Sequence, residues 1–369
     1  MRAPHHRETL PDALRALAMV SVLVLNAIGY TAAPWGPMLG QRMPADSALA
    51  AAMQGVVGAL LQGKGMAMLA FVFGMALWLS ARRRARPEAQ RRGLVRNRRL
   101  LRLGILHGLF VYFGDILTLY ALVGRLLLRR LHMPWRPLRR HLRRALLWAV
   151  LAKLAFLMLL LLPSAPWDEA APTSMATVQG AWAFVQLNAL AYTTSQLIGA
   201  LFAAPVVYLC MVCGVAAARL RLLTHRRWRP VLRCWLWRCG PALLGLSILY
   251  GWGSAVTQAS DPARTWIDAG GDLITVPVAA CYLAALALAS AGGQARWCHG
   301  LSPLGQRTLT LYVGHSVLCL VLFSGAGLAI ALSTVQMVLA CLGLWLLAWV
   351  AASRSGNRRW PLEAWMGRN

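Results

Sequence analysis

The feature that most constrains the fold is a pair of apolar runs between Arg98 and Arg130, RRLLRLGILHGLFVYFGDILTLYALVGRLLLRR, with arginines at both outer ends. Each run is long enough for most of a membrane crossing, and the short polar break between them is Gly114-Asp115. Because arginine marks the cytoplasmic side of membrane proteins, the pattern predicts a helical hairpin that enters a bilayer and returns. Asp115 should then lie at or near the opposite face.

The composition extends this prediction to the whole chain. Hydrophobic residues make up 59% of the sequence and charged residues 13%, which is too few to cover the surface of a soluble globule. We therefore predict an all-α, polytopic integral membrane protein, a single domain over residues 1–369, with about ten transmembrane helices in a range of about nine to twelve. The net charge of +27 comes from arginines in short segments between apolar runs. That distribution indicates cytoplasmic loops facing membrane lipids rather than a nucleic-acid site.

The predicted crossings follow the apolar runs. Two further segments do not fit a complete crossing: 47–61 is expected at the outer surface or as a re-entrant segment, and 179–194 as an interfacial helix. The expected transmembrane helices are 16–33, 66–79, the two arms of the hairpin, 145–162, 195–218, 240–257, 272–291, 303–325 and 335–352.

This count places both termini in the cytoplasm. Residues 353–369 then form a short basic cytoplasmic tail, and the arginine-poor loops 34–46 and 163–180 lie outside. An alternative for the first run is a secretory signal peptide, because Thr31-Ala32-Ala33 resembles a cleavage site. Lys64 is expected to reach the membrane surface with its amine.

The eight cysteines do not form a disulfide or metal framework. Cys210 and Cys213 make a C-x-x-C within an apolar run, with no second pair or histidine nearby, so packing is the preferred interpretation. We expect no metal site.

Three polar residues within apolar runs are the first candidates for a functional site. They are Asn26, His107 and Asp115, and a polar group at membrane depth is costly unless it faces a polar interior. We expect the three to converge on a hydrated hollow in the bundle. Structural alternatives exist for each: an interhelical hydrogen bond, a buried structural histidine, and a helix cap, respectively.

Three stretches of the chain resemble the YeiB-like family of bacterial inner-membrane proteins, also called domain of unknown function 418. LPDALRALAMVSVLVLN at 10–26 resembles the opening L-D-x-x-R-G-x-A of that family, and LHGLFVYFGDILTLYALVG in the hairpin resembles its H-x(7)-G-D-I-L-x-x-Y. Near the C-terminus, LGQRTLTLYVGHS resembles G-R-x-x-L-T-x-Y-x-x-x-S, and WPLEAWMGR resembles G-P-L-E-W-L-W-R. The resemblance implies a multi-pass protein of the bacterial inner membrane.

The family is in turn distantly similar to integral-membrane acyltransferases. Those proteins carry an acyl group from cytoplasmic acyl-CoA to a hydroxyl or amine across the bilayer, so the resemblance implies acyl-CoA as donor substrate and no tightly bound cofactor. In this interpretation His107, Asp115 and Asn26 are catalytic. Arg98, Arg99 and Arg102 would bind phosphates of acyl-CoA or lipid, and the residues expected to bind substrate are Asp12, Arg15, Tyr120, Thr310, Tyr312 and His315.

Three functions remain open from the sequence. The first is transfer of an acyl group to a small-molecule, lipid or glycan acceptor, with His107 as general base. The second is a small-molecule transporter or exporter with Asn26, His107 and Asp115 along its path. The third is a non-catalytic component that binds lipid or a partner. Glu363, one of few cytoplasmic acids, is expected to pair with loop arginines.

Overall fold

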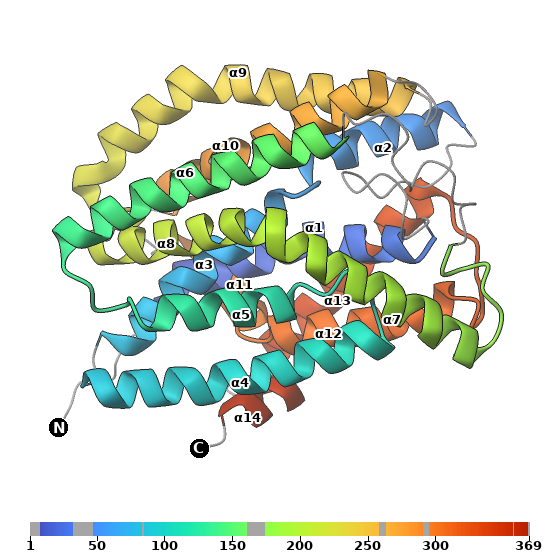
Figure 1. Ribbon diagram of the computed structural model, residues 1–369, viewed down its shortest axis with the longest axis horizontal. Helices are drawn as coiled ribbons and strands as arrows, with labels where there is room; N and C mark the ends of the chain where they lie inside the picture. The colour runs from blue at the N-terminus through green and yellow to red at the C-terminus, as the bar shows by residue number, and fades with distance from the viewer. Residues whose placement is uncertain are drawn as a thin grey trace.

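The computed structural model describes residues 8–31, 47–82, 85–160, 174–257, 263–290, 295–356 and 358–367, and the regular structure within these ranges is helical. The predicted external loop at 34–46 and the first part of the one at 163–180 lie outside the described residues. The all-α class is confirmed, and the helices form a bundle with their axes roughly along one direction (Figure 1).

The helices extend beyond the predicted apolar runs because the basic segments between them are also helical. Arginine is a good helix former, so α4, for example, begins twelve residues before Arg98. The first half of the chain forms α1 (Thr9–Thr31), α2 (Ala48–Leu60), α3 (Lys64–Ala81), α4 (Arg86–Phe110), α5 (Leu117–Leu128) and α6 (Trp135–Leu160). The second half forms α7 (Ala181–Ile198), the π-helical turn η1 (Gly199–Ala203), α8 (Ala204–Leu220), the 3₁₀ turn η2 (Arg226–Trp228), α9 (Arg229–Val256), α10 (Ala263–Ala289), α11 (Arg296–Gly305), α12 (Thr308–Phe323), α13 (Thr334–Arg354) and α14 (Pro361–Gly367).

Several of these helices are suited to a lipid bilayer. Among the described residues, six helical segments are long and apolar enough to cross a membrane, or seven if α11 and α12, bent by 59°, form one span. The helix α5 is apolar but has 12 residues, and α4 and α6 begin with arginine-rich turns. The chain is therefore a helical membrane protein with multiple candidate spans.

The two segments that were not expected to cross the membrane belong to longer candidate spans. Residues 48–60 form α2, which together with α3 makes a 34-residue candidate span, and residues 181–220 form a 40-residue span through the π turn. Lys64 lies at the break between α2 and α3. Its amine was expected to reach the membrane surface, but it is buried. Lys64 is 1% exposed and donates to the carbonyl of Gly58 at 2.7 Å, which satisfies an otherwise unpaired carbonyl near the end of α2.

The arginine-rich helix ends gather at one end of the bundle, at the left of Figure 1. Contacts between segments far apart in the chain establish this arrangement: Arg82 at the end of α3 binds Glu8 at 2.9 Å, and Arg99 of α4 donates to the carbonyl of Trp365 in α14 at 3.1 Å. We call this the arginine-rich end. The start of α1, the end of α3 and the C-terminal helix therefore lie on the same side of the bundle.

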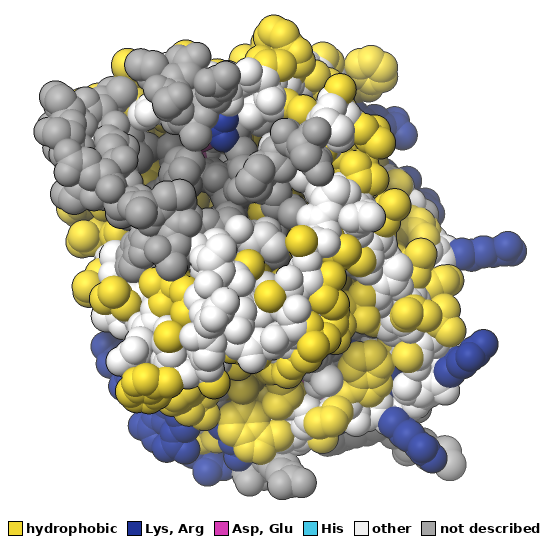
Figure 2. Space-filling view, turned by 90° about the vertical axis from the view of Figure 1, so that its right-hand side faces the viewer, with side chains coloured by type: hydrophobic (Ala, Val, Ile, Leu, Met, Phe, Trp, Pro, Cys, Tyr) yellow, Lys and Arg dark blue, Asp and Glu magenta, His cyan; other side chains and the backbone are white. Residues whose placement is uncertain are grey.

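The opposite end, which we call the distal end, holds the turn between α4 and α5. The hydroxyl of Tyr30, at the end of α1, lies 2.7 Å from the carbonyl oxygen of Val111 in this turn and 2.9 Å from that of Ser316 in α12. Figure 2 looks onto this end: hydrophobic side chains spread over the view, and most dark-blue Lys and Arg side chains project at its outline.

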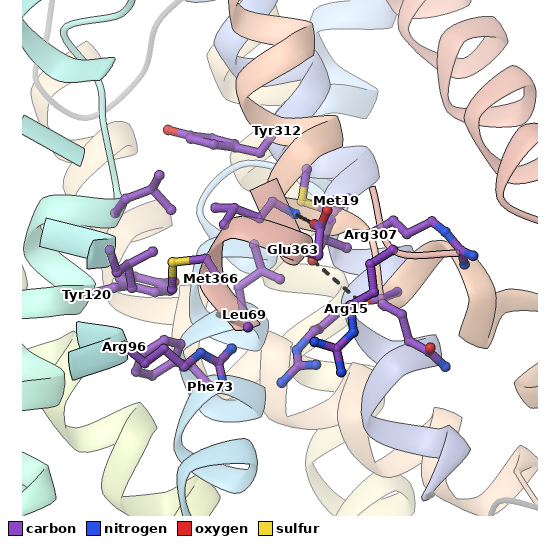
Figure 3. Close-up of a pocket in the computed structure, with 18 of the residues that line it drawn as sticks. Arg15, Met19, Leu69, Phe73, Arg96, Tyr120, Arg307, Tyr312, Glu363 and Met366 are labelled. Carbon is purple, nitrogen blue, oxygen red and sulfur yellow. Dashed lines mark hydrogen bonds between the residues drawn. The ribbon is translucent and has the colours of Figure 1, made fainter. Parts of the chain in front are cut away.

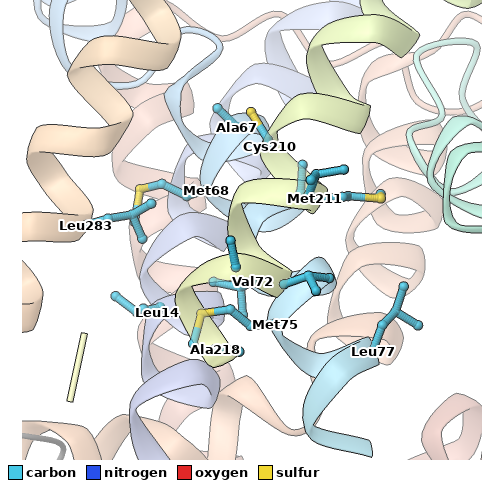
Figure 4. Close-up of a cluster of buried hydrophobic side chains, with 14 of the residues drawn as sticks. Leu14, Ala67, Met68, Val72, Met75, Leu77, Cys210, Met211, Ala218 and Leu283 are labelled. Carbon is cyan, nitrogen blue, oxygen red and sulfur yellow. The ribbon is translucent and has the colours of Figure 1, made fainter. Parts of the chain in front are cut away.

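The centre of the bundle is the packing of α3 against α8 and α1 (Figure 4). A Cβ built on Gly74 of α3 would lie 2.0 Å from the carbonyl oxygen of Met211, and one on Gly214 of α8 would lie 1.9 Å from that of Phe71. Two helices can approach this closely because both contact positions are glycine, as is typical of membrane helix pairs. Helix α3 is thereby held closely against α8 at the centre of the bundle.

Candidate functional site

The turn between α4 and α5 brings His107 and Asp115 into contact. The N–H groups of Val111 and Tyr112 both bond to the carbonyl of His107 at 2.9 Å, so the helix ends there and the chain reverses. His107 Nδ1 then lies 3.0 Å from Asp115 Oδ1, although the two residues would be about 12 Å apart along an uninterrupted helix. Both side chains are buried, at 1% and 0% exposure.

The second carboxylate oxygen of Asp115 caps α5. Thr118 N–H donates to Asp115 Oδ2 at 2.8 Å, so the carboxylate satisfies a free donor of the first helical turn. A Cβ on Gly104 would lie 2.6 Å from Thr118 N and 3.0 Å from Asp115 Oδ2, so α4 and α5 can meet here because position 104 is glycine. The same carboxylate therefore caps a helix and holds the imidazole.

The contact with Asp115 sets the tautomer of His107, because a carboxylate can only accept a hydrogen bond. With Nδ1 donating to the carboxylate, Nε2 carries the lone pair of the neutral imidazole. Nε2 is buried and has no hydrogen-bond partner among the described residues. A buried imidazole oriented in this way can accept a proton from a group brought to Nε2.

Tyr312 of α12 and Asn26 of α1 complete a cluster of four polar side chains. The Tyr312 ring lies 4.9 Å from that of His107, its hydroxyl donates to Asp115 Oδ1 at 3.4 Å, and the side chain of Asn26 lies beside that hydroxyl. Asn26 Nδ2 lacks a partner among the described residues. Asn26, His107 and Asp115 thus converge, as expected, but in a buried cluster joined through Tyr312 rather than in an open hollow.

Helix α7 holds the hairpin turn from the side, which the sequence did not predict. Asn188 donates to the carbonyls of Gly108 and Leu109 at 2.8 and 2.9 Å, and Gln196 donates to that of Asp115 at 3.0 Å. Tyr192 also contacts this region, through a 3.0 Å bond between its hydroxyl and that of Thr118. Asn188, in the segment 179–194 that was expected to be interfacial, and Gln196 just after it thus satisfy backbone groups freed where α4 ends.

A pocket of about 800 Å³ opens from the arginine-rich end and ends at Tyr312 (Figure 3). We call it the central pocket. Arg15 and Arg96 lie low in the view, near the apolar side chains of Leu69 and Phe73, and Tyr312 lies at the top. The lining residues are Arg15, Met19, Leu69, Phe73, Arg92, Arg96, Leu100, Ile116, Leu117, Tyr120, Gly305, Gln306, Arg307, Thr308, Leu309, Tyr312, Arg358, Arg359, Glu363, Met366 and Gly367.

Tyr312 connects the pocket to the cluster. Its side chain both lines the pocket and contacts His107 and Asp115, whereas those two residues and Asn26 lie behind it. Tyr120, also at the inner wall, donates from its hydroxyl to the carbonyl of Met66 at 2.5 Å. A ligand that enters from the arginine-rich end therefore meets Tyr312 before it reaches His107.

The first helix supplies a salt bridge at the pocket mouth. Arg15 lines the pocket and donates to Asp12 at 2.8 Å, while Asp12 is itself 2% exposed and lies outside the lining. Asp12 therefore holds a pocket-lining side chain without lining the pocket itself. From the sequence, we had predicted that both Asp12 and Arg15 bind substrate.

The C-terminal tail folds back as α14 and forms one wall of the pocket. Glu363 was expected to pair with loop arginines, but among the described residues it forms no salt bridge within 4 Å, although the charge of Arg307 is near enough to attract it. Instead, its Oε1 accepts the N–H groups of Leu309 and Thr310 at 2.9 and 3.0 Å, and its Oε2 accepts the Thr310 hydroxyl. The carboxylate thus caps α12, where it complements the helix dipole. Thr310 is used in this contact, and the lining of the central pocket does not include it.

The arginines predicted to bind phosphate lie on different faces of α4. Arg99 donates to the carbonyls of Trp365 and Met366, whereas Arg98 and Arg102 are exposed and line no described pocket. Arg92 and Arg96 line the central pocket in their place. The buried positions 97, 100, 104 and 107 of α4 set this orientation, because they share one helical face.

The arginine-rich end is strongly electropositive. Burial and the nearby charges of Arg86 and Arg219 lower the pKa of His132, which lies between α5 and α6. Arg307 is 3% exposed and donates to the carbonyls of Gly356 and Arg358, so part of this charge fastens the tail. The end can attract anions to the pocket mouth.

His315 lies apart from the four-residue cluster. Its ring contacts the sulfur atoms of Cys319 and Cys341 at 3.4 and 3.8 Å, and it is 3% exposed. Among the described residues, no three His, Cys, Asp or Glu side chains are grouped to hold a metal ion. His315 is therefore placed in core packing rather than at the pocket.

Residues 217–363 match the family described as "Protein of unknown function (DUF418)". The match runs from the end of α8 into α14, includes Tyr312 and Glu363, and confirms the resemblance to the YeiB-like family over this part of the chain. The hairpin with His107 and Asp115 precedes the matched residues. No curated protein matches the chain.

Proposed function

We propose that the protein is a membrane-embedded acyltransferase-like enzyme that takes an acyl group from acyl-CoA at the arginine-rich end. The observation that carries this proposal is the Asp115–His107 pair, 3.0 Å apart, with Nε2 unpaired among the described residues. The pair lies directly behind the inner end of a basic pocket. A carboxylate that orients an imidazole is the usual means of activating a hydroxyl or amine for acyl transfer.

The proposed step begins with an acceptor hydroxyl or amine at His107 Nε2. His107 takes the proton as the acceptor oxygen or nitrogen attacks the thioester carbonyl, and the carbon–sulfur bond breaks to release CoA thiolate, which takes the proton from the imidazolium. Asp115 stabilises that imidazolium through Nδ1–H. In this scheme Tyr312 O–H and Asn26 Nδ2, which is unpartnered among the described residues, donate hydrogen bonds to the developing oxyanion.

The proposal includes an orientation in the membrane. We infer that the arginine-rich end faces the cytoplasm of a bacterium and that the protein lies in its inner membrane, since arginine is enriched in cytoplasmic segments. With α2–α3, α7–α8 and α11–α12 each taken as one crossing and α4, α5 and α6 as crossings of their own, about ten crossings result, and both termini are cytoplasmic. Acyl-CoA would then reach the pocket from the cytoplasm.

A transporter is the second candidate, and an aromatic closure beyond the site favours it. Tyr30 lies one helical turn beyond Asn26 and stacks on Tyr112 at 5.1 Å, and Tyr112 contacts Phe113 at 5.0 Å. These three buried rings lie at the distal end, beyond the cluster, while the pocket is open at the arginine-rich end. If the rings can part, the same path could carry a molecule through the bundle.

The test is transfer of label from [¹⁴C]acetyl-CoA in proteoliposomes with hydroxyl- and amine-bearing acceptors supplied in the lumen or the lipid. We expect transfer by the unaltered protein and its loss in His107→Gln, while His299→Gln, at an exposed histidine of α11, retains it. Uptake of the acceptor without transfer would reject the enzyme in favour of the transporter.

A further inference from the structure

A second pocket of about 370 Å³ lies next to the central pocket, between the ends of α3 and α5 and the first half of α4. We call it the side pocket. Its floor is apolar and includes buried residues of the bundle core. The lining consists of Leu77, Ser80, Ala81, Ala89, Arg91, Arg92, Gly93, Val95, Arg96, Arg99, Leu128, Leu131, Met366 and Gly367.

The charged residues that line the side pocket are all positive. Four arginines of α4 line it, and the described residues of its lining include no carboxylate. Glu88, which does not line the pocket, pairs with Arg92 at 2.9 Å. Because both side chains are nearly half exposed, this pair is weak in water and leaves Arg92 able to bind a ligand. Guanidinium groups match the geometry of phosphate oxygens, which makes a phosphate ester the fitting ligand.

The two pockets share a wall. Arg92, Arg96, Met366 and Gly367 line both, so the last turn of α14 stands between them and the two arginines of α4 face both spaces. An elongated ligand could therefore lie across this turn, with phosphates at Arg92 and Arg96. One end would rest on the apolar floor formed by Leu77 and Leu128, and the other would point towards Tyr312.

We propose that the side pocket binds the phosphate-bearing end of the ligand whose reactive end enters the central pocket. This proposal rests on the proposed function, because the reactive end is the acyl group. The ligand chemistry is a phosphate ester joined to a flat or apolar group. Two sources have this chemistry: the soluble nucleotide portion of CoA and the headgroup region of an anionic phospholipid.

Arg91 tests the side pocket separately, because it lines that pocket and not the central one. The matched control is Arg140, an exposed arginine of α6 at the same end that lines none of the described pockets. Both Arg91→Gln and Arg140→Gln remove one positive charge, so a general electrostatic effect would appear equally in both.

The experiment measures binding of CoA, of adenosine 3′,5′-bisphosphate and of phosphatidylglycerol to the purified full chain in neutral detergent or neutral-lipid nanodiscs. We expect Arg91→Gln to weaken nucleotide and CoA binding about tenfold and Arg140→Gln to leave both unchanged. An Arg91 effect on phosphatidylglycerol in place of the nucleotide would identify the lipid source. Absence of binding by all three probes, or equal effects of the two variants, would overturn the proposal.

The same measurements separate this proposal from the proposed function. Binding that depends on Arg91 without any acyl transfer would retain the phosphate site and reject the enzyme. Transfer that depends on His107 but is unchanged in rate and in donor KM by Arg91→Gln would retain the enzyme and reject the side pocket.

Discussion

His107 and Asp115, eight positions apart in the chain, face each other across the turn between α4 and α5 with 3.0 Å between Nδ1 and Oδ1. The contact depends on the end of α4 at Phe110 and on a carboxylate that also caps α5. Hairpin geometry and imidazole orientation are therefore set by the same side chain. Substitutions of Asp115 therefore affect both stability and activity, whereas substitutions of its neighbours can affect one without the other.

Replacing Asp115 by Asn should retain the shape of the side chain and remove its charge. The imidazolium that forms during proton transfer then loses its counter-ion, and the other tautomer of His107 becomes available, so kcat for acyl transfer should fall roughly 10³-fold. Initial rates in proteoliposomes measure this. Glu8→Gln is the control, because it removes a partly exposed carboxylate that pairs with Arg82, and neither residue lines a described pocket. An Asp115→Asn rate within about threefold of the control would contradict the assigned function of Asp115.

The contact between α4 and α5 should not tolerate a methyl group at Gly104. A Cβ there would lie 2.6 Å from the backbone nitrogen of Thr118, so Gly104→Ala should destabilise the protein by about 1–3 kcal/mol. Gly343→Ala in α13 is the matched control, because no heavy atom lies within 4 Å of a Cβ there. Thermal unfolding in detergent compares the two variants, and equal unfolding temperatures would show that the hairpin is packed differently.

The tail should detach when Glu363 loses its charge. Glu363→Gln weakens the cap on α12 and the link to Thr310, at a cost of about 1–2 kcal/mol. We expect faster proteolysis of α14 by a protease added at the arginine-rich side, and weaker binding in the central pocket, of which α14 is a wall. An unchanged cleavage rate would show that other contacts hold α14 in place.

Removal of the Tyr312 hydroxyl should affect catalysis more than folding. Tyr312→Phe retains the ring against His107 but removes the group that lies 3.4 Å from Asp115, and we expect a roughly tenfold lower kcat with little change in donor KM. Tyr208→Phe removes a hydroxyl that bonds to Arg130, away from the central pocket, and is the control. A rise in KM alone would assign Tyr312 to donor binding.

The hairpin was largely predictable from the sequence. Two apolar runs, flanking arginines and the Gly114-Asp115 break predicted its arms and turn. The contact between His107 and Asp115 was not predictable, because it depends on how sharply the chain turns after Phe110. Hydrogen bonds from Asn188 and Gln196 of α7 hold that turn, and spacing within the hairpin carries no information about them.

The orientation of α4 could have been found from its polar and small residues. Asn97, Gly104 and His107 fall on one face, so Arg98 and Arg102 point away from it. The arginines predicted to bind phosphate were chosen by their proximity in sequence, and of these only Arg99 lines a described pocket, the side pocket. The packing of α14 against the pocket could not be predicted from the sequence either. Nothing in a short basic tail indicates that Glu363 caps the start of α12, more than 50 residues earlier in the chain.

The most direct test of the central claim is an experimental structure with a non-hydrolysable thioether analogue of acetyl-CoA. We predict that its phosphates lie at Arg92 and Arg96 and that its acyl carbonyl passes Tyr312 to within hydrogen-bonding reach of the cluster, with His107 still paired to Asp115. An analogue bound elsewhere, or a carbonyl that remains on the arginine side of Tyr312 with His107 and Asp115 apart, would contradict the account.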